Sequence, residues 1–321
     1  MPKYSIIVPV FNRPDEVNEL LASLTNQTVK DFEVLIVEDG SRVTSEEVVS
    51  NYTSKLNIWY FKKENTGQGF SRNFASERSQ GEWLIFFDSD CVIPPAYLSN
   101  LQNLTQDHSI HAFTGPDAAK EDFSFLQKAI SYSMTSFFTT GGIRGKKVKV
   151  DQEAHLRSYN LVMRKEVFQA LGGFHKTNMG EDMELSHRFG KSKHRAMVSD
   201  GLTVYHKRRN TLWSFFKQIF SFGQTRIQLK RSYDIAVKIP HFFPSVFTIV
   251  LIVGLISLAL FPFVGQLIFC IYAIYFLAIL LHATISQRSL IVGVLSMYTS
   301  LIQHLAYGLG FIAEALYLTK K

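Results

Sequence analysis

Two aspartates, Asp88 and Asp90, follow directly after an apolar run at 83–87, within the stretch GEWLIFFDSDC. Carboxylates this close raise each other's pKa, and they are unfavourable unless a divalent cation or sugar hydroxyl groups satisfy them. Their hard oxygen atoms suit Mg²⁺ or Mn²⁺. A single Asp-x-Asp is also common as a helix cap or a solvated turn, so the pair by itself leaves both interpretations open.

Other polar residues also follow apolar runs in the first third of the chain. Asn12 comes after the run 4–10, Asp39 lies at the end of the run 32–38, and the stretch NTGQG follows the run 58–61. Segments with helical spacing separate these runs, at 14–24, 45–52 and 69–78. This alternation predicts a mostly parallel α/β sheet with helices on both faces. In such sheets ligands bind beyond the carboxyl ends of the strands, where we expect these polar residues to gather.

The last quarter of the chain is apolar and almost uncharged. Residues 239–287 contain no Asp, Glu, Lys or Arg, and after Arg288 the next formal charge is Glu314. Such stretches exceed the roughly 20 apolar residues that cross a bilayer core. They predict three membrane spans near 242–261, 267–285 and 290–312, with breaks at 261–265 and 286–289. The alternative is a very apolar buried helical bundle.

The formal net charge of +7 is concentrated just ahead of the first predicted span. Lys and Arg near a span mark the cytoplasmic side and attract anionic lipids, so the basic balance needs no nucleic-acid partner. The segment 211–238 mixes aromatic and basic residues, which is typical of an interfacial helix. We therefore expect a multi-pass protein of the cell membrane whose N-terminal part, lacking a signal-peptide pattern, is cytoplasmic. Three spans place the C-terminal lysines outside, so one segment is alternatively re-entrant or interfacial.

Several motifs in order resemble those of the family 2 glycosyltransferases, which are inverting enzymes with the GT-A nucleotide-sugar fold. The resemblance runs from Ser5 to about His206 and is closest to membrane-anchored bacterial members. The motifs are IVPVFN at 7–12, VEDGS at 37–41, NTG at 65–67 with SRN at 71–73, FDSD at 87–90, and GGF at 172–174 followed by GED at 180–182. The resemblance implies a GT-A domain at 1–210. The composition described above then gives the interfacial segment 211–238 and a transmembrane helical domain at 239–321.

The resemblance also implies roles for residues that contact the nucleotide-sugar donor. These residues are Pro9, Phe11, Asn12, Asp39, Arg72, Asp88 and Asn160. Asp39 resembles the carboxylate that accepts a hydrogen bond from the nucleobase, although the same stretch also suits a tight turn at Gly40. Arg72 resembles an arginine near the base or diphosphate, with a surface helix charge as the alternative.

The metal and acceptor sides are implied in the same way. Asp90, Asp88 and His206 resemble the ligands of Mg²⁺ or Mn²⁺, although a lone His is more often an ordinary polar residue. Asp182 resembles the catalytic base, with Glu181 beside it as an acceptor contact. Acidic residues here also suit the N-terminus of a helix, so capping is the alternative.

The expected function is transfer of one sugar from a UDP- or GDP-sugar to a lipid-linked or saccharide acceptor in glycan or polysaccharide biosynthesis. Processive synthases carry a Gln-x-x-Arg-Trp signature, whereas this chain has FGQTR at 222–226 without the tryptophan. A processive polysaccharide synthase therefore remains the alternative. Rival classes are a nucleotidyltransferase, a nucleotide-binding membrane protein and a transporter. The segment 118–150 has weak periodicity and is expected to be a flexible loop over the acceptor site.

Overall fold

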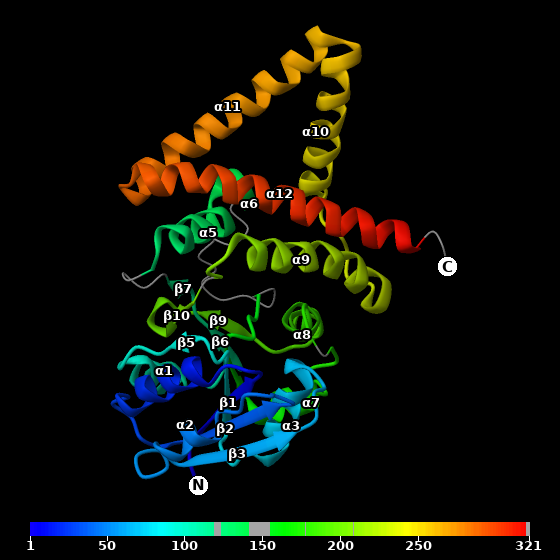
Figure 1. Ribbon diagram of the computed structural model, residues 1–321. Helices are drawn as coiled ribbons and strands as arrows, with labels where there is room; N and C mark the ends of the chain where they lie inside the picture. Colours follow the sequence, from blue (N-terminus) through cyan, green and yellow to red (C-terminus); the bar gives the residue numbers. More distant parts are fainter. Residues whose placement is uncertain (119–122, 141–154, 177, 208, 319–321) are drawn as a thin grey trace. The chain divides into compact units, whose positions relative to one another are not determined.

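The computed structural model describes residues 1–118, 123–140, 155–176, 178–207 and 209–318 (Figure 1). The chain forms two compact units. The first comprises Met1–Ala118 and Lys147–Lys207, and the second comprises Ala119–Lys146 and Arg208–Lys321. A segment from the middle of the chain thus belongs to the same unit as the C-terminal helices.

A seven-stranded sheet with the order β3-β2-β1-β4-β8-β6-β9 forms the centre of the first unit. β1 pairs parallel with β2 and with β4, and β2 pairs parallel with β3, as the apolar runs predicted. β8 pairs antiparallel with both β4 and β6, and β9 pairs parallel with β6. The strands are β1 (Tyr4–Val10), β2 (Phe32–Asp39), β3 (Ile58–Lys63), β4 (Trp83–Phe87), β6 (Ala112–Thr114), β8 (Asn160–Arg164) and β9 (Ala196–Val198).

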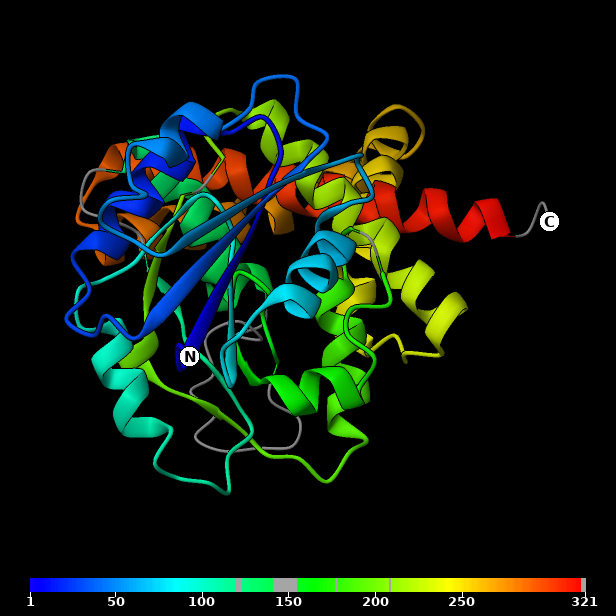
Figure 2. The same ribbon diagram turned by 90° about the horizontal axis from the view of Figure 1, so that it is seen from below.

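Alternating side chains of the sheet pack into two hydrophobic cores, one on each face. In β1, Ile6 and Val8 belong to the core that α1 completes, whereas Ile7 belongs to the core on the other face. Figure 2 shows α1 and α3 on opposite sides of these strands. Helices on both faces were predicted, and this prediction is confirmed. The helices of the first unit are α1 (Pro14–Thr25), α2 (Glu46–Ser50), α3 (Gln68–Arg78), α4 (Tyr97–Leu104), α7 (Lys165–Ala170) and α8 (Glu181–Gly190).

A second, three-stranded sheet lies next to the carboxyl end of β4. It consists of β5 (Cys91–Val92), β10 (Val204–His206) and β7 (Asp117–Ala118). β10 pairs antiparallel with β5 and places His206 opposite Cys91. A 3₁₀ turn at Asp200–Leu202 precedes β10, and the side chain of Ser199 accepts a hydrogen bond from the backbone N–H of Gly201 in this turn.

The second unit is helical within the residues that the structure describes. Ile239–Leu260, Pro262–Gln287 and Leu290–Tyr317 are long and apolar enough to cross a membrane. The first break is narrower than expected, because Pro262 begins a helix where its missing N–H is tolerated. The helices are α5 (Phe125–Thr135), α6 (Phe137–Thr140), α9 (Leu212–Tyr233), α10 (Phe243–Leu260), α11 (Pro262–Gln287) and α12 (Leu290–Leu318).

The expectation of a loop at 118–150 is wrong for residues 125–140. Ser124 and Gln127 form a capping box that starts α5, and α5 then packs against α12. The periodicity of this segment is weak because its small and hydroxyl-bearing residues face other helices instead of a purely apolar core. Residues 141–147, which supply its Gly and Lys content, lie outside the described part of the chain.

Candidate functional site

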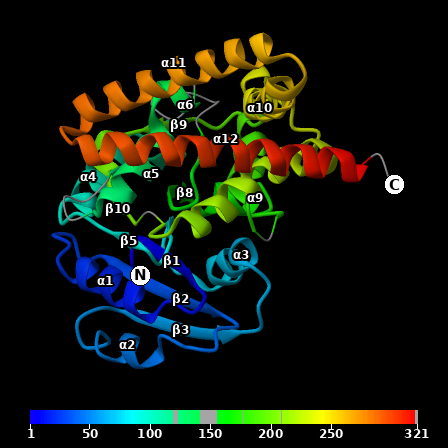
Figure 3. The same cartoon turned by 45° about the horizontal axis from the view of Figure 1, so that its top comes forward.

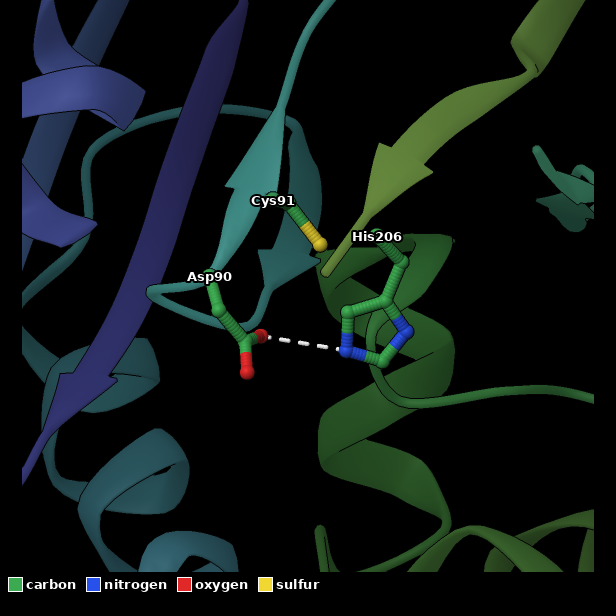
Figure 4. A group of neighbouring side chains, drawn as sticks. All are labelled: Asp90, Cys91 and His206. Atoms are coloured by element: carbon green, nitrogen blue, oxygen red, sulfur yellow. Dashed lines mark ion pairs between the residues drawn. The ribbon is translucent and has the colours of Figure 1, made fainter. Parts of the chain in front are cut away.

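Asp88, Asp90 and His206 come together at the carboxyl end of β4. Asp88 follows β4, Asp90 immediately precedes β5, and His206 ends the neighbouring strand β10. Oδ1 of Asp90 lies 3.0 Å from Nε2 of His206, and Oδ2 of Asp88 lies 4.0 Å from the same nitrogen. Figure 4 shows the Asp90 carboxylate and the His206 ring facing each other from adjacent strands. The three residues predicted as metal ligands therefore converge.

Each aspartate also contacts an arginine that is distant in sequence. Nη1 of Arg13 lies 2.5 Å from Oδ2 of Asp90, and Nη2 of Arg72 lies 2.5 Å from Oδ1 of Asp88. Burial would raise the pKa of Asp90, but His206 and Arg13 outweigh burial and hold that pKa below its usual range. Cations that are distant in sequence thus lie beside both carboxylates and favour the charged form of Asp90.

The remaining oxygen atoms form a donor set that fits a divalent cation. One oxygen of each aspartate is taken by an arginine, and the other oxygen faces Nε2 of His206. Two carboxylate oxygens and an imidazole nitrogen are suitable ligands for Mn²⁺ or Mg²⁺. Metal binding by these residues stays a prediction.

The thiol of Cys91 lies in the same cluster, and its ligand atom is within 4.8 Å of those of Asp90 and His206. It was not predicted as a ligand. The buried thiol donates to the carbonyl oxygen of Tyr159 at 3.6 Å, and burial raises its pKa well above the usual value. Only the thiolate is a good metal ligand, and Mg²⁺ and Mn²⁺ prefer oxygen atoms. Cys91 therefore packs behind the site.

Arg72 connects this cluster to the start of α8. Its side chain has no exposed area, which excludes the surface helix charge considered as the alternative. Besides Asp88, it donates to Oε1 of Glu181 at 3.0 Å. A buried guanidinium with two carboxylate partners is fixed in position. The residues predicted for the donor side and those predicted for the acceptor side therefore belong to one connected group.

Glu181 and Asp182 occupy the first turn of α8 but differ in surroundings. Oε1 of Glu181 also accepts hydrogen bonds from Gln68 at 2.7 Å and Ser158 at 2.9 Å. Burial, reinforced by Asp182 and opposed by Arg72, raises the pKa of Glu181 to about 7. Asp182 is half-buried, and its carboxylate accepts from the backbone N–H of Met183. Glu181 is thus held in place, whereas Asp182 is the more accessible carboxylate.

The predicted base-binding residues lie at the ends of β1 and β2. Asp39 is buried and accepts hydrogen bonds from the backbone N–H groups of Thr66 and Gly67, each at 2.9 Å, and from Lys63. It therefore shapes the loop after β3. Phe11 is 51% exposed, so its ring is open to a stacking partner, and Pro9 is half-buried beside it.

Asn12 forms hydrogen bonds with the backbone in this region through its side chain. It has φ 55°, a left-handed conformation that asparagine tolerates better than most residues. Its side-chain oxygen accepts from the backbone N–H groups of Arg42 and Val43, at 2.8 Å and 3.0 Å. Asn12 thus ties the end of β1 to the loop after β2.

Residues 5–172 match the family described as Glycosyl transferase family 2. The chain belongs to glycosyltransferase family 2. The match includes β1 to β4 with Asp88 and Asp90, whereas His206 and α8 lie beyond its end. The shared fold of the structural neighbours is the GT-A fold, as predicted.

Curated relatives of this glycosyltransferase share part of its length. An uncharacterized glycosyltransferase of Haemophilus influenzae is 37% identical over 131 residues, which are 39% of this chain and 44% of that protein. The poly(ribitol-phosphate) beta-N-acetylglucosaminyltransferase TarS of Staphylococcus aureus is 35% identical over 34% of this chain and 20% of its own. The alignments thus span less than half the length of these two relatives.

Solved structures share the fold over nearly the whole chain. The mannosyltransferase PcManGT of Pyrobaculum calidifontis, solved with GDP-Man and Mn²⁺, matches with a TM-score of 0.60 at 17% identity, over 98% of this chain and 87% of that one. Residues 1–349 of Staphylococcus aureus TarS, solved with UDP-GlcNAc, match with a TM-score of 0.53 at 18% identity, over 99% and 92%.

Asn160, which was predicted to contact the donor, is buried in the core of the glycosyltransferase. It lies opposite Phe87 in the β4–β8 pair and is fully buried. Its side-chain oxygen accepts from the hydroxyl of Tyr97, and its side-chain nitrogen donates to the carbonyl of Leu202, both at 2.6 Å. These contacts give Asn160 a structural role beneath the aspartates.

Two residues that support the site were not predicted. The ring of Tyr159 stacks on His206 with centroids 4.8 Å apart, and its hydroxyl bonds Arg157 at 2.8 Å and Asp117 at 3.1 Å. Tyr159 thus orients His206. In the sequence, the position of Tyr159 next to Asn160 was a weak indication of a role at the site. The sequence gives no indication for Arg13, because its partner Asp90 is 77 positions away.

Proposed function

We propose that this glycosyltransferase transfers one sugar, with inversion, from a UDP- or GDP-sugar to a membrane-associated, lipid-linked acceptor in glycan or polysaccharide biosynthesis. The observation that carries the proposal is the bridge from Asp88 through Arg72 to Glu181, which connects residues that we assign to the donor with one that we assign to the acceptor. The ligands of TarS and PcManGT support a nucleotide-sugar donor.

On the donor side, we propose that Phe11 and Pro9 form the wall of the base site and that Asp39 accepts a base N–H. Asp39 has two carboxylate oxygens with several acceptor positions, so its backbone contacts leave capacity for a ligand. Asn12 and Asn160 would support this site from behind. Arg72 would hold the sugar-diphosphate end, because its guanidinium is already oriented by two carboxylates.

Asp88, Asp90 and His206 would hold a divalent cation, Mg²⁺ or Mn²⁺, beside the diphosphate. When bound, such an ion neutralises negative charge on the leaving diphosphate. Tyr159 keeps the His206 ring in place, and Arg13 compensates Asp90. The protein residues thus preorganise the region where negative charge develops.

On the acceptor side, Asp182 would act as the catalytic base. It accepts the proton of the acceptor hydroxyl while that oxygen forms a bond to the anomeric carbon. The bond from the anomeric carbon to the diphosphate oxygen breaks on the opposite face, and the nucleoside diphosphate leaves with the electron pair. Glu181, held by Arg72, Gln68 and Ser158, would position the helix start and contact the acceptor.

The three long apolar helices support a membrane location and hence an acceptor in the membrane. The basic residues of α9 support a cytoplasmic catalytic unit. The net charge of +7 then serves lipid contact, and no nucleic-acid partner is needed.

The purified full chain in detergent, screened with UDP- and GDP-sugars and Mg²⁺ or Mn²⁺, tests the proposal. We expect release of a nucleoside diphosphate from one donor and sugar transfer to an extracted membrane lipid. Release of sugar 1-phosphate would instead indicate nucleotidyl transfer, and release of a nucleoside monophosphate would indicate transfer of a sugar phosphate. A folded protein that binds no nucleotide sugar would contradict the proposal.

A further inference from the structure

The last helix, α12, is amphipathic, although it is long enough to cross a membrane. One side carries polar residues at helical spacing, all of them buried: Ser296, Thr299, Ser300, Gln303 and His304. The other side is apolar and exposed, at Leu290, Ile291, Val294, Tyr298, Leu309 and Leu316. α10 differs, because apolar residues are exposed around most of its circumference. A helix with one polar and one apolar side is typical of an interface.

The first half of the polar side of α12 is covered by α5. The hydroxyl of Ser133 lies 2.6 Å from that of Thr299 and 3.2 Å from that of Ser300. Thr299 also donates to the carbonyl of Ala129 at 3.2 Å. α5 itself is a hydroxyl-rich helix that the sequence does not mark as a span. Thr299 and Ser300 of α12 thus pair with a non-spanning helix, whereas His304 contacts the Tyr275 hydroxyl of α11 at 2.7 Å.

The second half of α12 runs in close backbone contact with α9. A Cβ atom added to Gly223 of α9 would lie 2.2 Å from the carbonyl oxygen of Tyr307. A Cβ added to Gly310 of α12 would lie 2.1 Å from the carbonyl oxygen of Phe220. Figures 1 and 3 both show the two helices side by side. Contacts along this length require the two helices to share one depth relative to a membrane.

α9 is too polar to cross a bilayer. It contains Lys217, Arg226, Lys230 and Arg231 within 22 residues. A charge at the bilayer centre costs about 2.5–3.5 kcal/mol by insertion scales. Arg231 also pairs with Glu314 of α12 at 3.0 Å, so this part of α12 lies at the same polar level. Since α9 stays outside the hydrocarbon core, α12 stays outside it too.

We propose that only the hairpin α10–α11 crosses the membrane, and that α12 lies in the membrane interface with its apolar side on the lipid. The inference rests on the proposed membrane attachment of the chain and is independent of the sugar chemistry. The 18 residues of α10 extend about 27 Å, close to the roughly 30 Å of a bilayer core. The partner of the apolar side is therefore a lipid surface.

The charge distribution favours this topology over three spans. With two spans, Arg288 at the end of α11, the lysines at 320 and 321 and the basic residues of α9 share one side. With three spans, the C-terminal lysines lie on the opposite side. The turn at Phe261, which would face the outside, has no charged neighbour between 239 and 287. The two-span arrangement thus agrees with the positive-inside rule.

The test uses the full chain and locates two positions in separate preparations, the C-terminus and the turn at Phe261. Green fluorescent protein or alkaline phosphatase is appended after residue 321, and Phe261→Cys is introduced into a Cys270→Ser background for labelling intact cells with an impermeant thiol reagent. We expect a fluorescent C-terminus, inactive phosphatase, and labelling of Phe261→Cys from outside. The Cys270→Ser background alone is the control and should stay unlabelled, since Cys91 is buried.

Other outcomes separate the competing arrangements. Active phosphatase at the C-terminus, with Phe261→Cys labelled from outside, would mean three spans and would overturn the inference. A Phe261→Cys thiol that reacts only after lysis would overturn the crossing hairpin. Release of the whole protein by alkaline carbonate would instead refute membrane attachment, which is part of the proposed function and not specific to α12.

Discussion

Arg72 and Glu181 form a fully buried ion pair across 109 positions of the sequence, with 3.0 Å between Nη1 and Oε1. Because Arg72 also holds Asp88, one side chain connects the residues proposed to bind the donor with those proposed to bind the acceptor. Removing either partner of a buried pair leaves an uncompensated charge, so this connection is sensitive to small changes.

We expect Arg72→Lys to reduce transfer by on the order of tenfold or more and to lower the melting temperature. Lysine keeps the charge, but its single ammonium group does not reproduce the two-armed contact of a guanidinium. The matched control is Arg78→Lys, an exposed position on the same helix that should leave both quantities nearly unchanged. Equal behaviour of the two variants would show that the buried bridge is unimportant.

Transfer should require a divalent cation held at Asp90. We expect EDTA to abolish transfer, Mn²⁺ or Mg²⁺ to restore it, and Asp90→Asn to be inactive at all metal concentrations, since it loses a charged oxygen ligand. Asp107→Asn, on an exposed loop, is the control and should stay active. Undiminished turnover in chelator would refute the metal site.

Glu181 should make stability depend on pH. Its folded pKa is raised to about 7 by burial first and by Asp182 second, against a usual value near 4.5. The folded state therefore binds more protons than the unfolded state between these values, and the free energy of unfolding falls as pH rises from about 4.5 to about 7. This contribution is fully present below pH 4.5.

The measurement compares wild type with Glu181→Gln, because other groups titrate in the same range. Unfolding in detergent at several pH values should show that the free energy of unfolding falls more steeply with pH for wild type. The difference should be on the order of a few kcal/mol between about pH 4.5 and about pH 7. Parallel curves for the two proteins would mean that Glu181 does not titrate there.

The contact between α9 and α12 predicts a stability difference between neighbouring positions. Gly310→Ala should lower the free energy of unfolding by about 1–3 kcal/mol, because its Cβ would collide with the backbone of Phe220. Leu309→Ala, on the exposed apolar side, should cost much less. A Gly310→Ala variant as stable as Leu309→Ala would mean that the two helices are not in close contact.

The sequence predicted the first half of the fold well for a physical reason. The runs at β1, β2 and β4 are nearly continuous apolar segments, as expected of strands buried on both faces, so their limits were visible. β3 is an edge strand, and its apolar run ends before Lys62 and Lys63. The polar residues at their ends then marked one edge of the sheet. Local signals of this kind are available to sequence reasoning.

The rest depended on contacts between distant residues. The pairing of Arg13 with Asp90 and the stacking of Tyr159 on His206 leave no local pattern. The same holds for α5, whose Ser133 meets Thr299 across 166 positions. Truncation before residue 240 would remove α12, which packs against both α5 and α9. The C-terminal helices are therefore needed for the packing of α5 and α9 as well as for membrane attachment.

Asp182→Asn, measured for nucleotide-sugar affinity, melting temperature and transfer on one preparation, tests the central claim most directly. Asparagine keeps the size and caps a helix about as well as aspartate, but it does not accept a proton. We predict unchanged affinity and melting temperature, with transfer lower by on the order of a hundredfold or more. Normal transfer by Asp182→Asn would contradict the account and would place the catalytic carboxylate elsewhere, with Glu181 the next residue to test.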